Sequence, residues 1–176
     1  MSSTPFSELL NEQVAHEFAA HQQYVACAVY YESETLPRLA SFFYRQALEE
    51  RDHAMMMVQY LLDTDVTVVT PGVEAPKSGF ADAVEPVALA LEQEKRVSEQ
   101  INRLAATARE QRDYASEQFM QWFIREQIEE VATMSNLLRV AERSRADQAD
   151  IEDFIAREHQ DRAGQDPTAP HAAGSR

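Results

Sequence analysis

Glycine is scarce in this chain of 176 residues, and its distribution limits the fold. None of the four glycines lies in residues 1–71 or 80–163. A β-rich fold of this length needs many tight turns, in which glycine is strongly favoured. Both glycine-free stretches are instead rich in Ala, Leu, Glu, Gln and Arg, which favour helices. The chain is therefore expected to be all-α.

Basic residues, cysteines and long apolar runs are also scarce. Sixteen Lys and Arg against thirty Asp and Glu give a net charge of −14. Because no basic stripe is present, nucleic acid is not an expected partner. Cys27 is the only cysteine, which excludes an intramolecular disulfide. No apolar run approaches the roughly 18–20 residues that span a bilayer, and no signal peptide is apparent. We expect no membrane contact and a cytoplasmic location.

Prolines and short polar breaks divide the chain into five predicted helices. Pro5 and Pro37 suit the first position of a helix, where the missing N–H costs nothing. The predicted helices cover about residues 5–31, 37–63, 85–109, 114–143 and 147–159. One domain is expected over residues 1–162. Residues 163–176, rich in Pro, Ala, Gly and Ser, are predicted to form a disordered C-terminal tail.

The lengths of the connections predict the topology. The breaks near residues 35 and 112 are so short that each joins two antiparallel helices. Residues 65–82 contain two prolines and two glycines, and an extended segment of this length reaches about 60 Å. We expect a four-helix bundle in which this long crossover makes helices two and three parallel. The fifth helix is a short C-terminal addition.

A glutamate interrupts the apolar stripe of each of the four long helices. The four are Glu17, Glu50, Glu94 and Glu130, and His53 lies one turn from Glu50 on the same face. Folding the first hairpin about its break places Glu17 level with residues 53–54. Folding the second places Glu94 level with Glu130. If the crossover aligns the hairpins, four carboxylates and one imidazole meet at one depth in the core.

Such a group of buried carboxylates indicates a metal site. An unpaired buried carboxylate costs several kcal/mol, and neighbouring carboxylates also repel one another. No basic residue lies on the four stripes at this depth, so two divalent cations would best balance the charge. Oxygen ligands with a single imidazole suit iron or manganese better than zinc. A helical interaction protein with paired glutamates would need basic partners in the core, and these are missing.

Longer motifs surround these residues. They are Leu10-Asn-Glu-Gln, Glu17 and Tyr24, then Glu49-Glu50-Arg-Asp-His53-Ala, Glu94, and Gln121-Trp-Phe-Ile-Arg-Glu-Gln-Ile-Glu-Glu130. Together they make the chain resemble the ferritin family, and in particular the non-haem bacterial ferritins, over about residues 5–160. A fourth helix with Gln127-x-x-Glu130 resembles ferritins proper more than bacterioferritins.

The resemblance implies a role for each residue of a di-iron site. Glu17, Glu50 and His53 would hold one iron, Glu94 and Glu130 the second, with Glu50 as the bridge. Gln127 would lie near the second iron.

Four residues beside this set have two possible roles each. Tyr24 is either a hydrogen-bond donor or redox-active phenol, or a core residue. Glu49, Glu126 and Glu129 would add a third iron site with Glu130, or else form a solvated acidic face.

The resemblance also implies an activity. Two Fe(II) ions would be oxidised by O₂, and the Fe(III) stored as a mineral inside a homo-oligomeric shell of 24 subunits. Haem is not expected, because Arg51 stands where bacterioferritins place the haem-ligating methionine. The main alternative is a di-iron oxidase or peroxidase of the rubrerythrin type, without storage, although such proteins often carry a Cys-x-x-Cys module. Starvation-type mini-ferritins place their site between subunits, unlike the set here.

Overall fold

The computed structural model describes residues 4–159 and 166–174, and helices dominate this part of the chain. The five are α1 (Pro5–Ser33), α2 (Pro37–Asp63), α3 (Glu85–Glu110), α4 (Tyr114–Arg143) and α5 (Ala149–Glu158). The all-α prediction is confirmed, and the helix ends agree with the sequence patterns to within about two residues.

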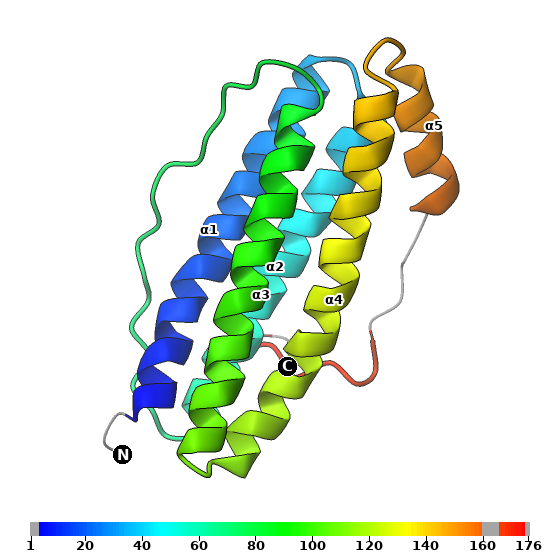
Figure 1. The fold of residues 1–176 in the computed structure, drawn as a ribbon. Coiled ribbons are helices and arrows are strands. Elements are labelled where there is room, and N and C mark those ends of the chain that lie inside the picture. Colours follow the sequence, from blue (N-terminus) through cyan, green and yellow to red (C-terminus); the bar gives the residue numbers. More distant parts are fainter. Residues whose placement is uncertain (1–3, 160–165, 175–176) are drawn as a thin grey trace.

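The four long helices form a bundle with one long crossover (Figure 1). Helices α1 and α2 form one antiparallel hairpin, and α3 and α4 form the other. Between the hairpins the chain runs the length of the bundle beside α1, so α2 and α3 point in the same direction (Figure 1). This is the topology predicted from the connection lengths.

Two side-chain amides of α1 hold the crossover. Asn11 accepts a hydrogen bond from the backbone N–H of Val69 (2.9 Å) and donates one to its carbonyl (3.2 Å). Gln23 does the same with Lys77, at 3.0 and 2.8 Å. Each amide thus satisfies one residue of an extended segment that has no strand partner. These bonds fix the crossover against α1 at two points along its length.

Helices α1, α2 and α3 end without glycine. Thr35, Asp65 and Arg112 follow the three helix ends with φ of 62°, 57° and 58°. In each case the next residue donates a backbone hydrogen bond to a carbonyl in the last helical turn, as from Leu36 to Tyr31 (2.9 Å). A left-handed residue other than glycine costs roughly 1–2 kcal/mol. Packing of the hairpins must therefore offset this cost.

The short helix α5 is fixed to the start of α2. The first turn of α2 has no side-chain cap of its own. Glu152 of α5 supplies one, because its carboxylate accepts the backbone N–H groups of Arg38 (2.9 Å) and Leu39 (2.8 Å). Ile151 and Ile155 are buried in the core beside α2 and α4. The negative charge also lies at the positive end of the α2 dipole.

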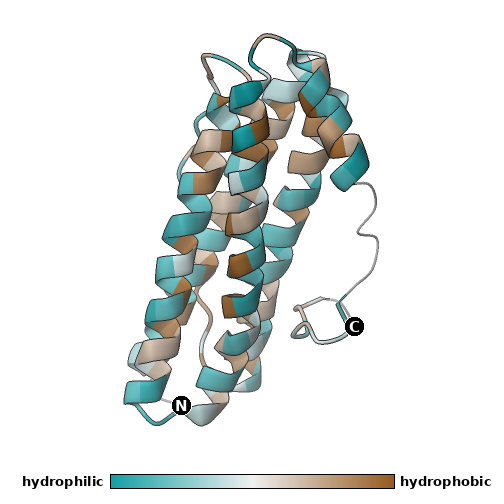
Figure 2. Ribbon diagram, turned by 45° about the vertical axis from the view of Figure 1, so that its right-hand side comes forward, coloured by the Kyte–Doolittle hydropathy of each residue, from teal (hydrophilic) through white to brown (hydrophobic). Residues whose placement is uncertain are grey.

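The apolar core consists of two separate clusters. One fills the end of the bundle near the α1–α2 turn, and the other fills the opposite end. Polar and apolar residues alternate along the helices in Figure 2, as expected of amphipathic bundle helices. No helix in the described ranges combines the length and apolarity needed to cross a membrane. Between the clusters lies a buried polar layer, which contains the glutamates singled out from the sequence.

In the C-terminal segment the structure describes residues 166–174, which contact the bundle, and the disordered tail over residues 163–176 stays a prediction. Asp166 accepts a hydrogen bond from the indole Nε1 of Trp122 (2.9 Å), and the backbone N–H of Ala173 donates to the Met55 carbonyl (3.0 Å). Ala169 packs against the apolar cluster at the end of the bundle opposite the α1–α2 turn. These are isolated contacts without helical periodicity, which explains why the sequence pattern does not reveal them. Residues 163–165 and 175–176 lie outside the described residues.

Trp122 is the only tryptophan of the chain and reports on this segment. It is 8% exposed. Truncation after residue 165 should remove the Asp166 contact and expose the indole, which would shift its emission to longer wavelength and increase quenching by acrylamide. Asp150→Ala, on an exposed aspartate of α5, serves as the control. Unchanged emission and quenching in the truncated protein would show that the segment does not cover Trp122.

Candidate metal centre

Three residues from two helices form the compact part of the polar layer. Glu17 comes from α1, and Glu50 and His53 come from α2. Each offers one ligand atom, and these atoms all lie within 4.8 Å of one another. The exposed fractions of the three residues are 1%, 1% and 5%. A set with this spacing could hold one metal ion without rearrangement of the backbone.

Local helix geometry and aromatic packing orient His53. Its three-residue separation from Glu50 places both on one helical face, with Nδ1 3.4 Å from Glu50 Oε2. The rings of Trp122 and Phe123 meet the imidazole at steep angles, 77° and 80°, with centroids 5.5 and 5.8 Å away. These aromatic contacts restrict the rotation of the imidazole.

The second hairpin contributes Glu94 and Glu130, both buried. Glu94 already has hydrogen-bond donors on both oxygens. The Tyr24 hydroxyl donates to Oε1, and Gln127 Nε2 donates to Oε2 at 3.0 Å. Tyr24 is therefore a hydrogen-bond donor to the centre as well as a fully buried core residue. Gln127 thus lies beside Glu94, and its place near a second iron stays a prediction.

Burial and mutual repulsion disfavour the charged forms of these carboxylates. Burial, followed by the charges of Glu94 and Glu17, raises the pKa of Glu50 well above its usual range. Burial and the charge of Glu94 raise the pKa of Glu130 in the same way. Burial also raises the pKa of Glu94, although its bonds to Tyr24 and Gln127 oppose that shift. A bound cation would reverse this balance by stabilising the ionised carboxylates.

Unpaired oxygen atoms show that the residues fit a cation. Four buried carboxylate oxygens have no hydrogen-bond partner within the described part of the chain. They are Glu17 Oε2, both oxygens of Glu50, and Glu130 Oε2. Buried polar atoms are almost always paired, and unpaired ones need an explanation. Metal coordination by carboxylate oxygen satisfies these atoms and compensates the charge.

The three glutamates predicted as a third site lie on the outer side of this layer. Glu49 and Glu129 are exposed, while Glu126 is half-buried. Burial raises the pKa of Glu126, and the charges of Glu129 and Glu49 add to the shift. Glu49 and Glu126 also act on Glu130. The structure thus brings the acidic residues close to the second half of the centre, in a more hydrated position.

A sequence model of the ferritin-like domain matches residues 7–144, which span all four long helices and the polar layer. The chain belongs to the ferritin family. The ferritin BfrB of Mycolicibacterium smegmatis is 54% identical over 171 residues, which cover 97% of this chain and 94% of that protein. A bacterial non-heme ferritin of Staphylococcus aureus is 37% identical over 132 residues, covering 75% and 80%.

Solved structures support the same assignment for this ferritin. An open-pore ferritin from the archaeon Archaeoglobus fulgidus superimposes with a TM-score of 0.84 at 26% sequence identity. The match covers 89% of this chain and 96% of the archaeal chain. The ferritin-like bundle predicted from the sequence, with its crossover and short fifth helix, is therefore confirmed.

Sequence reasoning missed Gln13, a buried polar residue of this ferritin's central layer. Gln13 is 2% exposed, and its Nε2 donates to Glu17 Oε1 at 2.9 Å. It lies four residues before Glu17 and hence on the same helical face. That spacing was visible, but glutamine is common on exposed helix surfaces and carries no charge to mark it.

Proposed function

We propose that this ferritin oxidises Fe(II) with O₂ at the centre formed by Glu17, Glu50, His53, Glu94 and Glu130. The observation that carries the proposal is the buried layer of carboxylates with unpaired oxygens between two apolar clusters. Oxygen ligands with one imidazole nitrogen suit iron. Iron is both the substrate and the cargo in this proposal.

Glu50 is the proposed bridge between two iron ions. Neither of its oxygens has a hydrogen-bond partner among the described residues, although His53 Nδ1 lies 3.4 Å from Oε2. The charges of Glu94, Glu17 and Glu130 all raise the pKa of Glu50, which supports a position between the two halves of the layer. A carboxylate in this position can give one oxygen to each metal. The first iron would use Glu17 and His53, and the second would use Glu94 and Glu130.

The two proposed iron sites differ in how far their ligands must rearrange before a metal can bind. Glu17, Glu50 and His53 already place their ligand atoms close together. Glu94 must exchange or share its hydrogen bonds with Tyr24 and Gln127 before it can bind a metal fully. We therefore expect the first iron to bind more tightly than the second.

The protein favours oxidation through charge. Carboxylate ligands in a buried site stabilise Fe(III) more than Fe(II), which lowers the reduction potential of the bound iron. Each of two Fe(II) ions gives one electron, and O₂ accepts the pair. The Tyr24 hydroxyl donates a hydrogen bond to Glu94 and so stabilises negative charge on that carboxylate. We propose a third iron site, through which Fe(III) would leave the centre for the interior of the shell. Its ligands would be Glu49, Glu126, Glu129 and Glu130.

Storage requires assembly, and we propose a shell of 24 identical subunits. Large apolar side chains of three helices, Val29, Leu62 and Ile128, are more than half exposed in the single chain. Contacts between subunits would remove such area from water. The number of subunits rests on family resemblance. The absence of haem and the cytoplasmic location stay predictions from the sequence.

Size measurement before and after aerobic Fe(II) loading tests the storage proposal. A subunit of 20.0 kDa should run as a particle of hundreds of kilodaltons. Loading with hundreds of Fe(II) per particle in air should give iron that co-elutes with this particle and raises its density. Oxidation without retained iron would favour the rubrerythrin-type alternative. A monodisperse monomer or dimer at near-physiological salt would contradict storage.

A further inference from the structure

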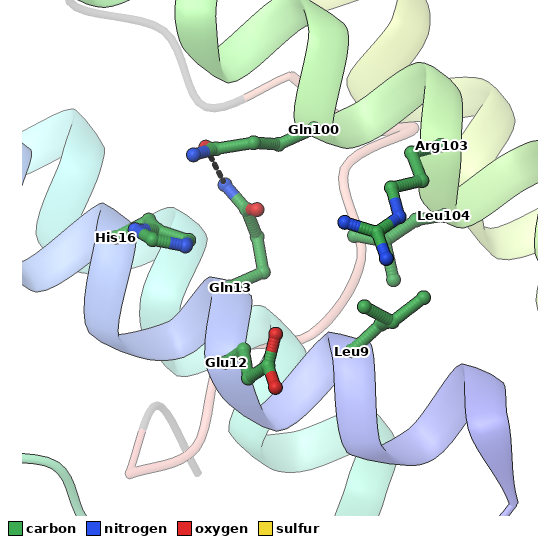
Figure 3. Close-up of a pocket in the computed structure, with 7 residues that line it drawn as sticks. All are labelled: Leu9, Glu12, Gln13, His16, Gln100, Arg103 and Leu104. Atoms are coloured by element: carbon green, nitrogen blue, oxygen red, sulfur yellow. Dashed lines mark hydrogen bonds between the residues drawn. The ribbon is translucent and has the colours of Figure 1, made fainter.

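A buried amide links the metal centre to the outer face of α1 and α3. Gln13 Nε2 donates to Glu17 Oε1 at 2.9 Å. The same nitrogen donates to Gln100 Oε1 of α3 at 3.2 Å (Figure 3). The amide nitrogen carries two hydrogens, so both are used. Gln13 is 2% exposed, whereas Gln100 is half-buried. The side chain is thus held from both sides.

The hydrogen bond from Gln13 makes the two carboxylate oxygens of Glu17 unequal. Oε1 accepts from Gln13, and Oε2 has no partner among the described residues. Glu17 also belongs to the compact group with Glu50 and His53. A carboxylate that is free to rotate could present either oxygen or both. Because Oε1 already accepts one hydrogen bond and Oε2 accepts none, Oε2 is the oxygen more available to a metal.

Gln13 also separates this group from a surface pocket. A pocket of about 40 Å³ lies between α1 and α3 and is lined in part by Gln13, Gln100, Glu12 and His16 (Figure 3). Among the described residues, the hydrogen bond between Gln13 and Gln100 joins α1 to α3 beside this pocket. An apolar residue of similar size would fill the space but leave Glu17 Oε1 without a donor. A shorter residue would open the pocket toward Glu17.

We propose that Gln13 is a positioning residue for the metal centre. Its amide holds Glu17 in the orientation that directs Oε2 at the metal, and Gln100 anchors that amide to α3. Hydrogen bonds to ligating side chains commonly control metal affinity in this way. The inference rests on the proposed function, because it requires Glu17 to bind metal.

Titration with Co(II) tests the inference without iron oxidation. Gln13→Met keeps the length of the side chain and suits a buried helix position, but it cannot donate a hydrogen bond. We expect Co(II) affinity at the tighter site to fall by about 10–100-fold, together with a change in the visible Co(II) spectrum. The helical circular dichroism and the particle size should match those of the wild type.

Two controls separate positioning from general damage. Gln23→Met makes the same substitution on the same helix, where the amide binds the crossover at Lys77, and it should leave Co(II) affinity unchanged. In a Glu17→Gln background, adding Gln13→Met should cause little further loss, because both changes act through one ligand. Wild-type affinity in Gln13→Met, or equal losses in both backgrounds, would overturn the inference.

The same titration distinguishes this inference from the proposed function. If Glu17→Gln and His53→Ala bind Co(II) as the wild type does, the metal centre itself is assigned wrongly. If those two variants lose affinity while Gln13→Met does not, the centre stands and only the role of Gln13 fails.

Discussion

His53→Ala is expected to slow the rapid phase of Fe(II) oxidation by about 10–100-fold or more. His53 is the only nitrogen ligand in the proposed centre, and its imidazole is oriented by Trp122 and Phe123. Its loss should weaken the first iron site, so that fewer subunits hold two Fe(II) when O₂ arrives. Stopped-flow absorbance at two Fe(II) per subunit measures the rate. Circular dichroism and particle size check that the cavity left beside Trp122 does not unfold the bundle.

Glu130→Ala should damage the second iron site to a similar extent, which tests whether both irons are needed. Glu129→Ala is the matched comparison, because it removes a neighbouring carboxylate that is exposed rather than buried. It should spare the first turnover and affect only later ones. Wild-type rates in His53→Ala and Glu130→Ala would mean that oxidation takes place elsewhere in the particle.

The fold could be predicted because its helices and connections are strongly marked in the sequence. Stripes of apolar residues give the helices, and the two short breaks permit only antiparallel hairpins. The backbone conformations at the helix ends could not be predicted in the same way. Thr35, Asp65 and Arg112 adopt left-handed conformations that are usually marked by glycine. Their conformations follow from hairpin packing rather than from local preference.

The approach of Glu17 to Glu50 and His53 could be predicted for a similar reason. A short turn fixes the register of a helical hairpin, so Glu17 must lie near Glu50 and His53. The longer crossover does not fix the relation between hairpins in this way. Its path depends on the amide groups of Asn11 and Gln23, whose partners lie more than fifty residues away. The roles of these glutamates as iron ligands remain predictions.

Two contributions to the site's surroundings could not be predicted from periodicity. Gln13 differs from other helix glutamines only through its partners, Glu17 and Gln100, the second of which is on another helix. The C-terminal segment is held by the hydrogen bond between Trp122 and Asp166, by the backbone bond from Ala173 and by the packing of Ala169. Both arise from tertiary packing between residues that carry no local pattern.

Glu50→Gln should make the protein more stable in the absence of metal and less stable in its presence. Neither buried oxygen of Glu50 has a hydrogen-bond partner in the described residues, and the charges of neighbouring carboxylates raise its pKa. The amide removes one charge from this group at nearly constant shape. An unsatisfied buried polar group costs about 1–3 kcal/mol, and a charged one costs more. For a chain of this length, each kcal/mol changes the apparent Tm by about 2–4 °C.

The difference between the metal-free proteins should grow with pH. The folded-state pKa of Glu50 is raised, so the folded protein binds more protons than the unfolded chain above the usual pKa of glutamate. Stability from this group is present at low pH and is lost as pH rises through the folded pKa. The metal-free wild type should therefore lose more stability than Glu50→Gln between about pH 5 and pH 8, a range that starts above the ordinary glutamate pKa of about 4.3.

Adding anaerobic Fe(II) or Co(II) should reverse the order. A ligand at 100 times its Kd stabilises the folded state by about 2.7 kcal/mol. The wild type should gain stability on this scale, whereas Glu50→Gln lacks the bridging charge and should gain much less. Glu99→Gln, on an exposed glutamate of α3, should match the wild type with and without metal. Thermal unfolding of the three proteins, with and without metal, measures all of these differences.

Two outcomes would contradict this prediction. If Glu50→Gln is less stable than the wild type without metal, the Glu50 carboxylate stabilises the apoprotein, contrary to the expectation from its unpaired oxygens. If it gains as much from metal as the wild type, Glu50 is not a ligand.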